Sequence, residues 1–224
     1  MRKYAAIFSC VFLLTLLAQS SDVQAANQPP ELKTGWNRVY IENVGSIDLP
    51  PTMEIQKESI KEAIYKPFNM KIPQLVAQTK GTNENIKMGF EKYARVIIET
   101  DIGNFGDYEK LNFNVYRFSK NDIAELDMII KQQIQQAWSA NPRMGMKLIE
   151  WYPLKVKNIN GMSCLHTNYT RQTHNNPVVL EHIYTFLNND RVHRLTILCN
   201  LSYVDYWKDD IADILDSFRI TNIR

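Results

Sequence analysis

The C-terminal part of the chain most restricts its fold, because it consists of long segments in which apolar and polar residues alternate. A period of two is typical of strands whose two faces meet different surroundings. Short polar turns rich in Asn and Gly separate the segments, so successive strands reverse direction and pair antiparallel. The pattern predicts a meander of four strands, over residues 147–157, 162–173, 178–187 and 191–201.

The last hairpin of this meander also has a predicted register. A tight turn centred on residues 189–190 places Phe186 opposite His193 and Cys199 opposite Leu180. The apolar faces of the two strands then point to the same side, and a slip of one residue would turn one of them toward solvent. We therefore expect this hairpin to contribute one face to the core.

Two amphipathic helices are predicted, one before the meander and one after it. Ser119 caps the first, with Asp122 at the positive end of the helix dipole, and Ser202 caps the second. Their apolar residues recur at three- and four-residue spacing, which is typical of a helix packed on a sheet. The stripes are Ile123, Leu126, Ile130, Ile134 and Trp138 in the first helix, and Val204, Trp207, Ile211, Ile214 and Phe218 in the second.

The N-terminal half of the domain is less regular. Residues 92–100 include three successive β-branched residues and predict a central strand, and residues 58–68 predict a short helix that Pro67 ends. Residues 69–90 give no clear assignment beyond a short strand at 75–77. Further short strands are predicted at 36–43, 46–49, 53–56 and 218–220.

These elements together predict the fold class. Both helical stripes need an apolar partner, and the strand at 92–100 is apolar on both of its faces. We therefore expect an α+β fold, in which one antiparallel β-sheet is sandwiched by helices on both faces in an α/β/α arrangement.

The first 25 residues have the three regions of a cleavable secretory signal peptide. Arg2 and Lys3 are positive, residues 5–18 are apolar, and small residues precede a cleavage site after Ala25. An uncleaved membrane anchor is the alternative, but a spanning helix needs about 20 apolar residues. We expect a secreted or periplasmic protein with a linker at 26–35, a single domain at 36–224, and no transmembrane segment after cleavage.

Charge and composition exclude some classes of partner. The chain has 26 Lys and Arg against 24 Asp and Glu, and cleavage of the signal leaves this balance near zero. No basic stripe typical of a nucleic-acid-binding protein is present, so we expect no nucleic-acid partner. A hydrophobic content of 45%, with 11% aromatic residues, is enough to build a folded core and argues against disorder.

Two cysteines, Cys164 and Cys199, remain after signal cleavage. An even pair in an exported protein favours a disulfide. The predicted register argues the other way, because about six residues of strand length and two strand spacings separate the thiols. A disulfide needs Cα atoms within about 7 Å of each other. We therefore predict two free, buried thiols.

No catalytic, cofactor-binding or metal-ligating residue is assigned from the sequence. His182 and His193 share a predicted strand face but lie about 13 Å apart, too far for one metal ion. Cys164 and His166 share a face of their strand, which leaves a reactive thiol there as the alternative to a core residue. Neither a nucleophile elbow nor a phosphate-binding glycine loop is present.

One short motif is a candidate partner-binding site. Trp151 and Tyr152 are neighbours on a predicted strand, so their rings point to opposite faces, and Pro153 interrupts the ladder as it would at a sheet edge. An exposed aromatic side chain at an edge is a typical partner contact. If helices cover both faces of the sheet, however, both rings belong to the core.

The order of elements resembles that of the PsbP-like superfamily, which includes the extrinsic PsbP protein of photosystem II and exported bacterial DcrB-type proteins. The resemblance rests on residues 45–53, similar to an early hydrophobic-Pro-x-x-Trp turn, and on residues 184–198 leading into the helix at 207–218. Met53 stands where the family has Trp, and residues 67–89 match none of its elements. The resemblance implies an antiparallel sheet with helices on both sides, and proteins that bind partners without a shared catalytic site.

We therefore expect an exported, soluble, non-catalytic binding or assembly protein. Its partner would be a protein or a small ligand in the extracytoplasmic space, and no cofactor is implied. A secreted hydrolase, whose residues converge from distant positions, is the alternative. An enzyme predicts a deep pocket that holds a titratable group with a perturbed pKa, whereas a binding module predicts a shallow apolar patch.

Overall fold

A computed structural model of the chain describes residues 29–83, 91–112 and 118–224. The predicted signal peptide and the start of the linker lie outside these residues. The strands are β1 (Asn37–Ile41), β2 (Gly45–Leu49), β3 (Met53–Ile55), β4 (Leu75–Thr79), β5 (Ala94–Ile102), β6 (Met146–Ile159), β7 (Met162–Thr173), β8 (Val179–Asn188), β9 (Arg191–Asn200) and β10 (Arg219–Ile220), and the helices are α2 (Glu58–Tyr65), α4 (Lys120–Ala140) and α5 (Val204–Ser217).

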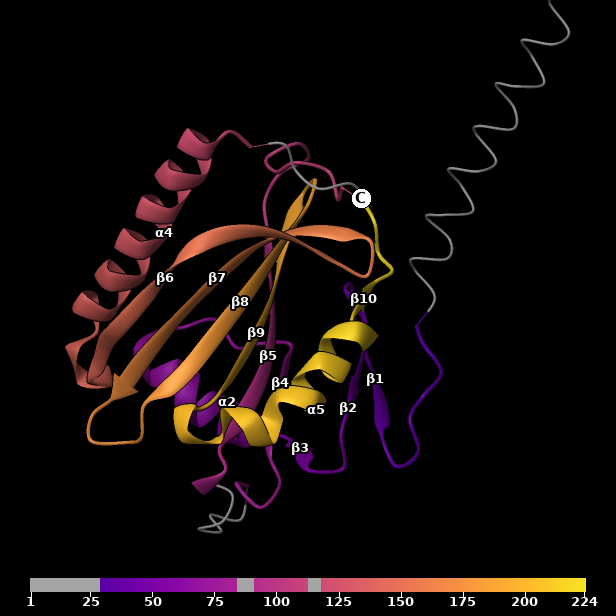
Figure 1. The fold of residues 1–224 in the computed structure, drawn as a ribbon, viewed down its shortest axis with the longest axis vertical. Coiled ribbons are helices and arrows are strands. Elements are labelled where there is room, and N and C mark those ends of the chain that lie inside the picture. Colours follow the sequence, from indigo (N-terminus) through magenta and orange to yellow (C-terminus); the bar gives the residue numbers. More distant parts are fainter. Residues whose placement is uncertain (1–28, 84–90, 113–117) are drawn as a thin grey trace, which may run out of the picture.

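A seven-stranded antiparallel sheet forms the centre of the molecule (Figure 1). Its strands follow the order β3-β4-β5-β9-β8-β7-β6, so the predicted meander makes up more than half of it. Phe186 pairs with His193 and Leu180 pairs with Cys199, which confirms the predicted register of the last hairpin. β5 lies between β4 and β9, as expected for a central strand.

A second, three-stranded sheet was not predicted. It has the order β1-β2-β10, so the two-residue strand near the C-terminus pairs with the N-terminal hairpin. Pro50 and Pro51 follow β2, and because proline lacks an N–H donor they end the pairing before β3 begins in the large sheet. The expected single sheet is therefore divided at this turn.

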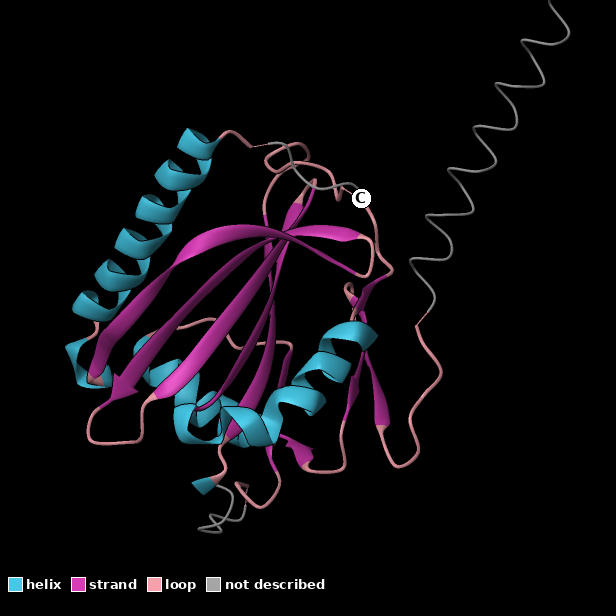
Figure 2. Cartoon of the chain, in the orientation of Figure 1, coloured by secondary structure: helices cyan, strands magenta, loops and turns pink. Residues whose placement is uncertain are grey.

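Helices cover both faces of the large sheet, as predicted (Figure 2). On one face, Trp207 and Ile214 of α5 pack in the core with Val96 of β5. On the opposite face, Trp138 of α4 meets the ring of Tyr169 edge-on, with 5.8 Å between the ring centroids. α2 shares the face of α4. The fold is therefore a mixed α+β fold with an α/β/α arrangement.

The hydrophobic core lies between the large sheet, the small sheet and α5. The small sheet and α5 contribute large side chains that are fully buried, and these meet the inner residues of β5, β8 and β9. Burial of each such side chain stabilises the fold by about 1.5–3 kcal/mol. The bulkiest members are Trp207, Phe186, Phe218, Ile47, Ile98, Leu195 and Ile197.

α4 packs less tightly than its apolar stripe predicted. Every stripe residue, from Ile123 to Trp138, is half-buried, and no residue of the helix is fully buried. The reason is its place in the fold, because α4 lies beside β6 at the edge of the sheet (Figure 1). Only one flank of the stripe therefore meets the sheet.

The two predicted helix caps have different outcomes. The Ser119 cap is confirmed, because its hydroxyl accepts from the Asp122 N–H while the Asp122 carboxylate accepts from the Ser119 N–H. The Ser202 cap is wrong. The side chain of Asn200 accepts from the Ser202 N–H instead and starts a single 3-10 turn at residues 201–203, so α5 begins only at Val204.

No helix within the described residues is long and apolar enough to cross a bilayer.

Candidate functional site

Charged and hydroxyl side chains lie in a row on the sheet face that α4 and α2 share. Tyr169 of β7 is paired with Glu181 of β8, which is paired in turn with Leu198 of β9, the partner of Arg95 on β5. Alternation along the strands therefore brings these side chains to one face. Sequence reasoning treated this face as helix-covered core and did not predict the row.

Arg171 and Glu181 form the centre of this row. The Arg171 Nε atom donates to a Glu181 carboxylate oxygen at 2.5 Å, and the Tyr169 hydroxyl donates to the other oxygen at 2.9 Å. Both charged side chains are mostly buried, with exposed fractions of 15% and 10%. Burial alone would lower the pKa of Arg171, but Glu181 and Tyr169 raise it above its ordinary value. Arg171 is therefore a permanent cation.

A pocket of about 390 Å³ opens beside this pair, and we call it the two-arginine pocket. Its volume is typical of small-molecule sites. Arg95 and Arg171 contribute guanidinium groups, and the larger part of the lining surface is apolar. The full lining is Tyr93, Arg95, Met146, Arg171, Thr173, Asn176, Pro177, Val179 and Asn200.

Arg95 has donors that the protein leaves unused. Its Nε atom is buried and has no hydrogen-bond partner among the described residues. One Nη2 donor reaches the Gln78 side chain at 3.2 Å, and the guanidinium lies 5.3 Å from the centre of the Tyr93 ring. A buried donor without a partner costs free energy, and more so when it is charged. The pocket therefore places an incompletely satisfied cation against an apolar wall.

Local structure explains how these residues meet. Arg95 and Val96 are neighbours on β5, so their side chains point to opposite faces of the sheet. Val96 enters the core, and Arg95 faces away from it. Arg171 lies near the end of β7, and the turn at residues 174–177 brings Asn176 and Pro177 over the same end of the sheet. Met146, at the start of β6, closes the third side, where its sulfur accepts from Arg171 Nη1 and from Thr173.

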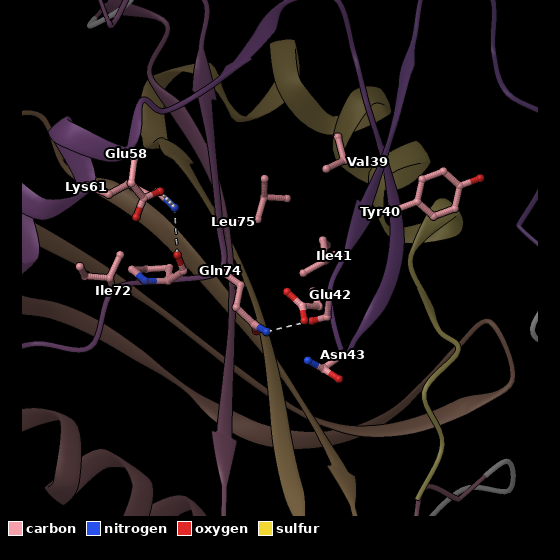
Figure 3. A pocket seen from close by; sticks show the side chains of 11 residues that line it. Val39, Tyr40, Ile41, Glu42, Asn43, Glu58, Lys61, Ile72, Gln74 and Leu75 are labelled. Atoms are coloured by element: carbon pink, nitrogen blue, oxygen red, sulfur yellow. Dashed lines mark hydrogen bonds and ion pairs between the residues drawn. The ribbon is translucent and has the colours of Figure 1, made fainter.

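A second pocket, of about 490 Å³, lies between β1 and the segment before β4 (Figure 3). Val39 and Ile41 of β1 face Leu75 across it, and Tyr40 points away. Its buried cation, Lys61, already has partners. The buried Lys61 ammonium contacts Glu58 at 2.7 Å and donates to the Pro73 carbonyl at 3.3 Å.

This second pocket is the weaker candidate, although it is the larger of the two. Gln74, which lies at its far end, also has a partner, because its side chain donates to the Glu42 carbonyl. A ligand would therefore have to displace existing bonds there. In the two-arginine pocket, a ligand could use donors that are still free.

A third cluster lies on the core face of β7 and β8. His166 Nε2 and His182 Nδ1 are 3.0 Å apart, and the ring of His166 stacks on Tyr184 with 4.6 Å between centroids. Burial, followed by the charge of Lys157, lowers the pKa of His166 to about 3 and that of His182 to about 4. Both rings are therefore neutral near pH 7, and they are poor general acids or bases at that pH.

This pair was not predicted from the sequence, where only His182 and His193 were expected to share a face. The predicted distance between those two is consistent with the register, since His193 pairs with Phe186 while His182 pairs with Ile197. His166 pairs with Tyr184 and reaches His182 diagonally, which only the register of β7 against β8 reveals. No group of three or more His, Cys, Asp or Glu in the described ranges is arranged to hold a metal ion.

The two cysteines are free and buried, as predicted. Burial raises the pKa of Cys164 to about 12 and that of Cys199 to about 11. A thiolate is the reactive form of cysteine, so both side chains are chemically inert near neutral pH. This argues against the reactive thiol at Cys164.

The candidate partner site, Trp151 and Tyr152, lies on the edge strand β6. The Trp151 ring stacks on Tyr169 at 5.5 Å, and its N–H donates to Asp127 of α4, so this side chain is part of the packing under α4. Tyr152, on the opposite face, donates to Glu150. The pairing of β6 with β7 is irregular between Tyr152 and Lys155, as Pro153 predicted. A partner-binding role for these two residues stays a prediction.

Comparisons with known proteins concern the fold. No family model matches the sequence, and no curated protein matches it. Among solved structures, the chain is similar to the solution structure of cyanobacterial PsbP (CyanoP) from Synechocystis sp. PCC 6803, with a TM-score of 0.48 and 10% identity over 86% of this chain and 97% of that one. A crystal structure from Bacteroides thetaiotaomicron has a TM-score of 0.33 and 8% identity over 78% of this chain, which covers 44% of that protein.

Proposed function

We propose that this chain is an exported, non-catalytic binding protein whose ligand is a small organic anion held in the two-arginine pocket. The observation that carries the proposal is the buried Arg95 Nε atom, which has no partner among the described residues. A ligand oxygen at this point would replace a missing hydrogen bond with a charge-assisted one.

The composition of the pocket supports binding rather than hydrolysis. Its described lining has no carboxylate, histidine or cysteine that could act as a general base or nucleophile. Burial raises the pKa of Tyr93 above its ordinary value, so the phenol stays protonated near pH 7 and can donate a hydrogen bond. Cationic and neutral donors of this kind hold an anion without reacting with it.

The experiment is a thermal-shift assay of the mature chain with a panel of organic carboxylates, phosphates and sulfonates. We expect at least one anion to raise the Tm of the wild-type protein, and Arg95→Gln to abolish that shift. The matched control is Arg194→Gln, which removes a cation from the same sheet face but leaves the pocket lining intact. If no anion shifts the Tm, or if both variants lose the shift equally, the proposal is wrong.

Export is a separate part of the proposal, supported by the composition of residues 1–25. We expect the protein in the secreted or periplasmic fraction of its native cells, and Edman sequencing to begin at Ala26. A protein that stays in the cytoplasm with its N-terminal segment uncleaved would contradict export and leave the pocket unaffected.

A further inference from the structure

We infer that the ligand of the two-arginine pocket is an amphiphilic monocarboxylate, a molecule with one carboxylate group and an apolar body. This inference rests on the proposed function and narrows it to one chemical class. It follows from two properties of the pocket, its charge and the distribution of its apolar surface.

The charge of the pocket favours a single negative charge. Two guanidinium groups line it, but Glu181 neutralises Arg171 through a direct ion pair. Glu181 lies on β8, which also contributes Val179 to the pocket lining, so it would also repel a second negative charge on the ligand. Of the two pocket arginines, only Arg95 has no acidic partner among the described residues. A carboxylate matches this net charge of one, and a phosphate dianion exceeds it.

The hydrogen-bonding geometry also fits a carboxylate. A guanidinium offers donors in a planar fork, which pairs with the two oxygens of a carboxylate. Arg95 Nε is free, and only its Nη2 is engaged, by the neutral Gln78 side chain. Tyr93 lies against the same guanidinium and retains its proton, so its hydroxyl is a further donor to an anion bound there.

The apolar surface defines the rest of the ligand. Met146, Pro177 and Val179 line the pocket beside the arginines, and the aromatic ring of Tyr93 adds to them. Most of the lining surface is apolar, which is unfavourable for a small hydrated anion such as inorganic phosphate but favourable for an alkyl or aryl chain. Met146 has a flexible side chain, so the wall can adjust to chains of different length.

The test compares four probes that share one alkyl chain, octanoate, octyl phosphate, 1-octanol and octylammonium, by isothermal titration calorimetry. We expect octanoate to bind at least about 10-fold more tightly than each of the other three, the effect of one charge-assisted hydrogen bond. Equal affinity for octanoate and 1-octanol, or tighter binding of octylammonium, would overturn the inference. These comparisons use the wild-type protein, so they hold even if a variant fails to fold.

Three substitutions at two residues separate the class of ligand from the existence of the site. Arg95→Gln should weaken octanoate about 10-fold or more and leave 1-octanol unchanged, while Arg95→Lys should restore part of the loss. Glu181→Gln removes the negative charge and keeps one acceptor oxygen, for either Tyr169 or Arg171, so it should improve octyl phosphate relative to octanoate.

The outcomes distinguish this inference from the proposed function. If octyl phosphate binds the wild-type protein more tightly than octanoate and depends on Arg95, the pocket binds anions but the monocarboxylate class is wrong. If none of the four probes depends on Arg95, and the anion panel also gives no Arg95-dependent shift, both the inference and the proposed function fail.

Discussion

The Nε2 atom of His166 lies 3.0 Å from the Nδ1 atom of His182, under a tyrosine ring and close to a lysine. One of the two nitrogens must donate the proton that they share, so the contact is lost when both rings are protonated, because both nitrogens are then donors. His166 is 3% exposed, and its Nδ1 atom has no partner in the described part of the chain. A second proton therefore has no acceptor and no solvent to stabilise it.

This pair makes the stability of the protein depend on pH. The pKa of each ring is lower in the folded protein than the value of 6.5 expected after unfolding, so the unfolded chain binds more protons as the pH falls. Above about pH 6.5, the histidine pair should cause no change in the free energy of unfolding with pH. It should fall between pH 6.5 and the pKa values of the folded rings, about 4 for His182 and about 3 for His166, by about 1.4 kcal/mol for each unit by which a pKa is lowered.

Urea denaturation at a series of pH values measures this effect. The charges of Lys155 and Lys157 act on His166, and those of Lys157 and Glu181 act on His182. His182→Gln should reduce the pH dependence, because glutamine hydrogen-bonds but does not titrate, while His193, whose pKa burial lowers to about 4, still contributes. His174→Asn, in an exposed turn where asparagine tolerates the positive φ of 51°, should leave the pH dependence unchanged. An unaltered slope in His182→Gln would contradict this account.

Asp127 connects α4 to the sheet, so we expect it to stabilise the packing of this helix. One carboxylate oxygen accepts from the Trp151 indole at 2.9 Å and from the buried Leu154 N–H at 2.7 Å. Asp127→Ala leaves two donors without an acceptor, so we expect it to lower the free energy of unfolding by about 1–3 kcal/mol. Asp127→Asn keeps an acceptor and should lose less. The exposed Glu125→Ala on the same helix is the control, and hydrogen exchange of α4 should increase only in the Asp127 variants.

The two thiols should be inaccessible in the folded protein and available after unfolding. Both pKa values are raised by burial, to about 12 for Cys164 and about 11 for Cys199, so little thiolate exists at pH 8. We expect a chromogenic disulfide reagent to react slowly with the native mature chain and with two thiols per chain in denaturant. Rapid reaction of the native protein would contradict the burial, and no reaction in denaturant would reveal a disulfide.

Gly45 should not tolerate a side chain. A Cβ atom at this position would lie 2.0 Å from the Arg219 carbonyl oxygen, where β10 pairs with β2. The backbone of β10 would have to move, so we expect Gly45→Ala to cost roughly 2–4 kcal/mol. Gly35→Ala is the control, because an added Cβ meets no atom within 4 Å there and only the positive φ of 80° is costly, by about 1–2 kcal/mol. Chemical denaturation of both variants gives the comparison.

Much of the fold follows from local patterns in the sequence. Alternation and turn residues place the four meander strands, and the turn at residues 189–190 sets their last register, since Phe186 meets His193 as expected. The Ser119 and Asp122 cap follows from three-residue spacing. These features depend on residues close in sequence, which one chain displays directly.

Features that depend on distant pairing were not predictable in this way. The three-stranded sheet needs β10 to return to β2, across most of the chain. The half-burial of α4 depends on its position at the sheet edge rather than on its stripe. The Ser202 cap failed because the side chain of Asn200, at the end of β9, accepts from the Ser202 N–H and starts a 3-10 turn, so α5 begins only at Val204.

The sequence by itself determined the alternating strands, the amphipathic helices and the separation of the two cysteines, because each depends on spacing along the chain. Only the tertiary structure decided which side chains share a pocket. Arg95 and Arg171 lie on different strands, and pairing through β8 and β9 brings both to one sheet face beside Tyr93. The pocket and its unsatisfied guanidinium arise from that pairing, since spacing along the chain does not reveal which strands lie side by side.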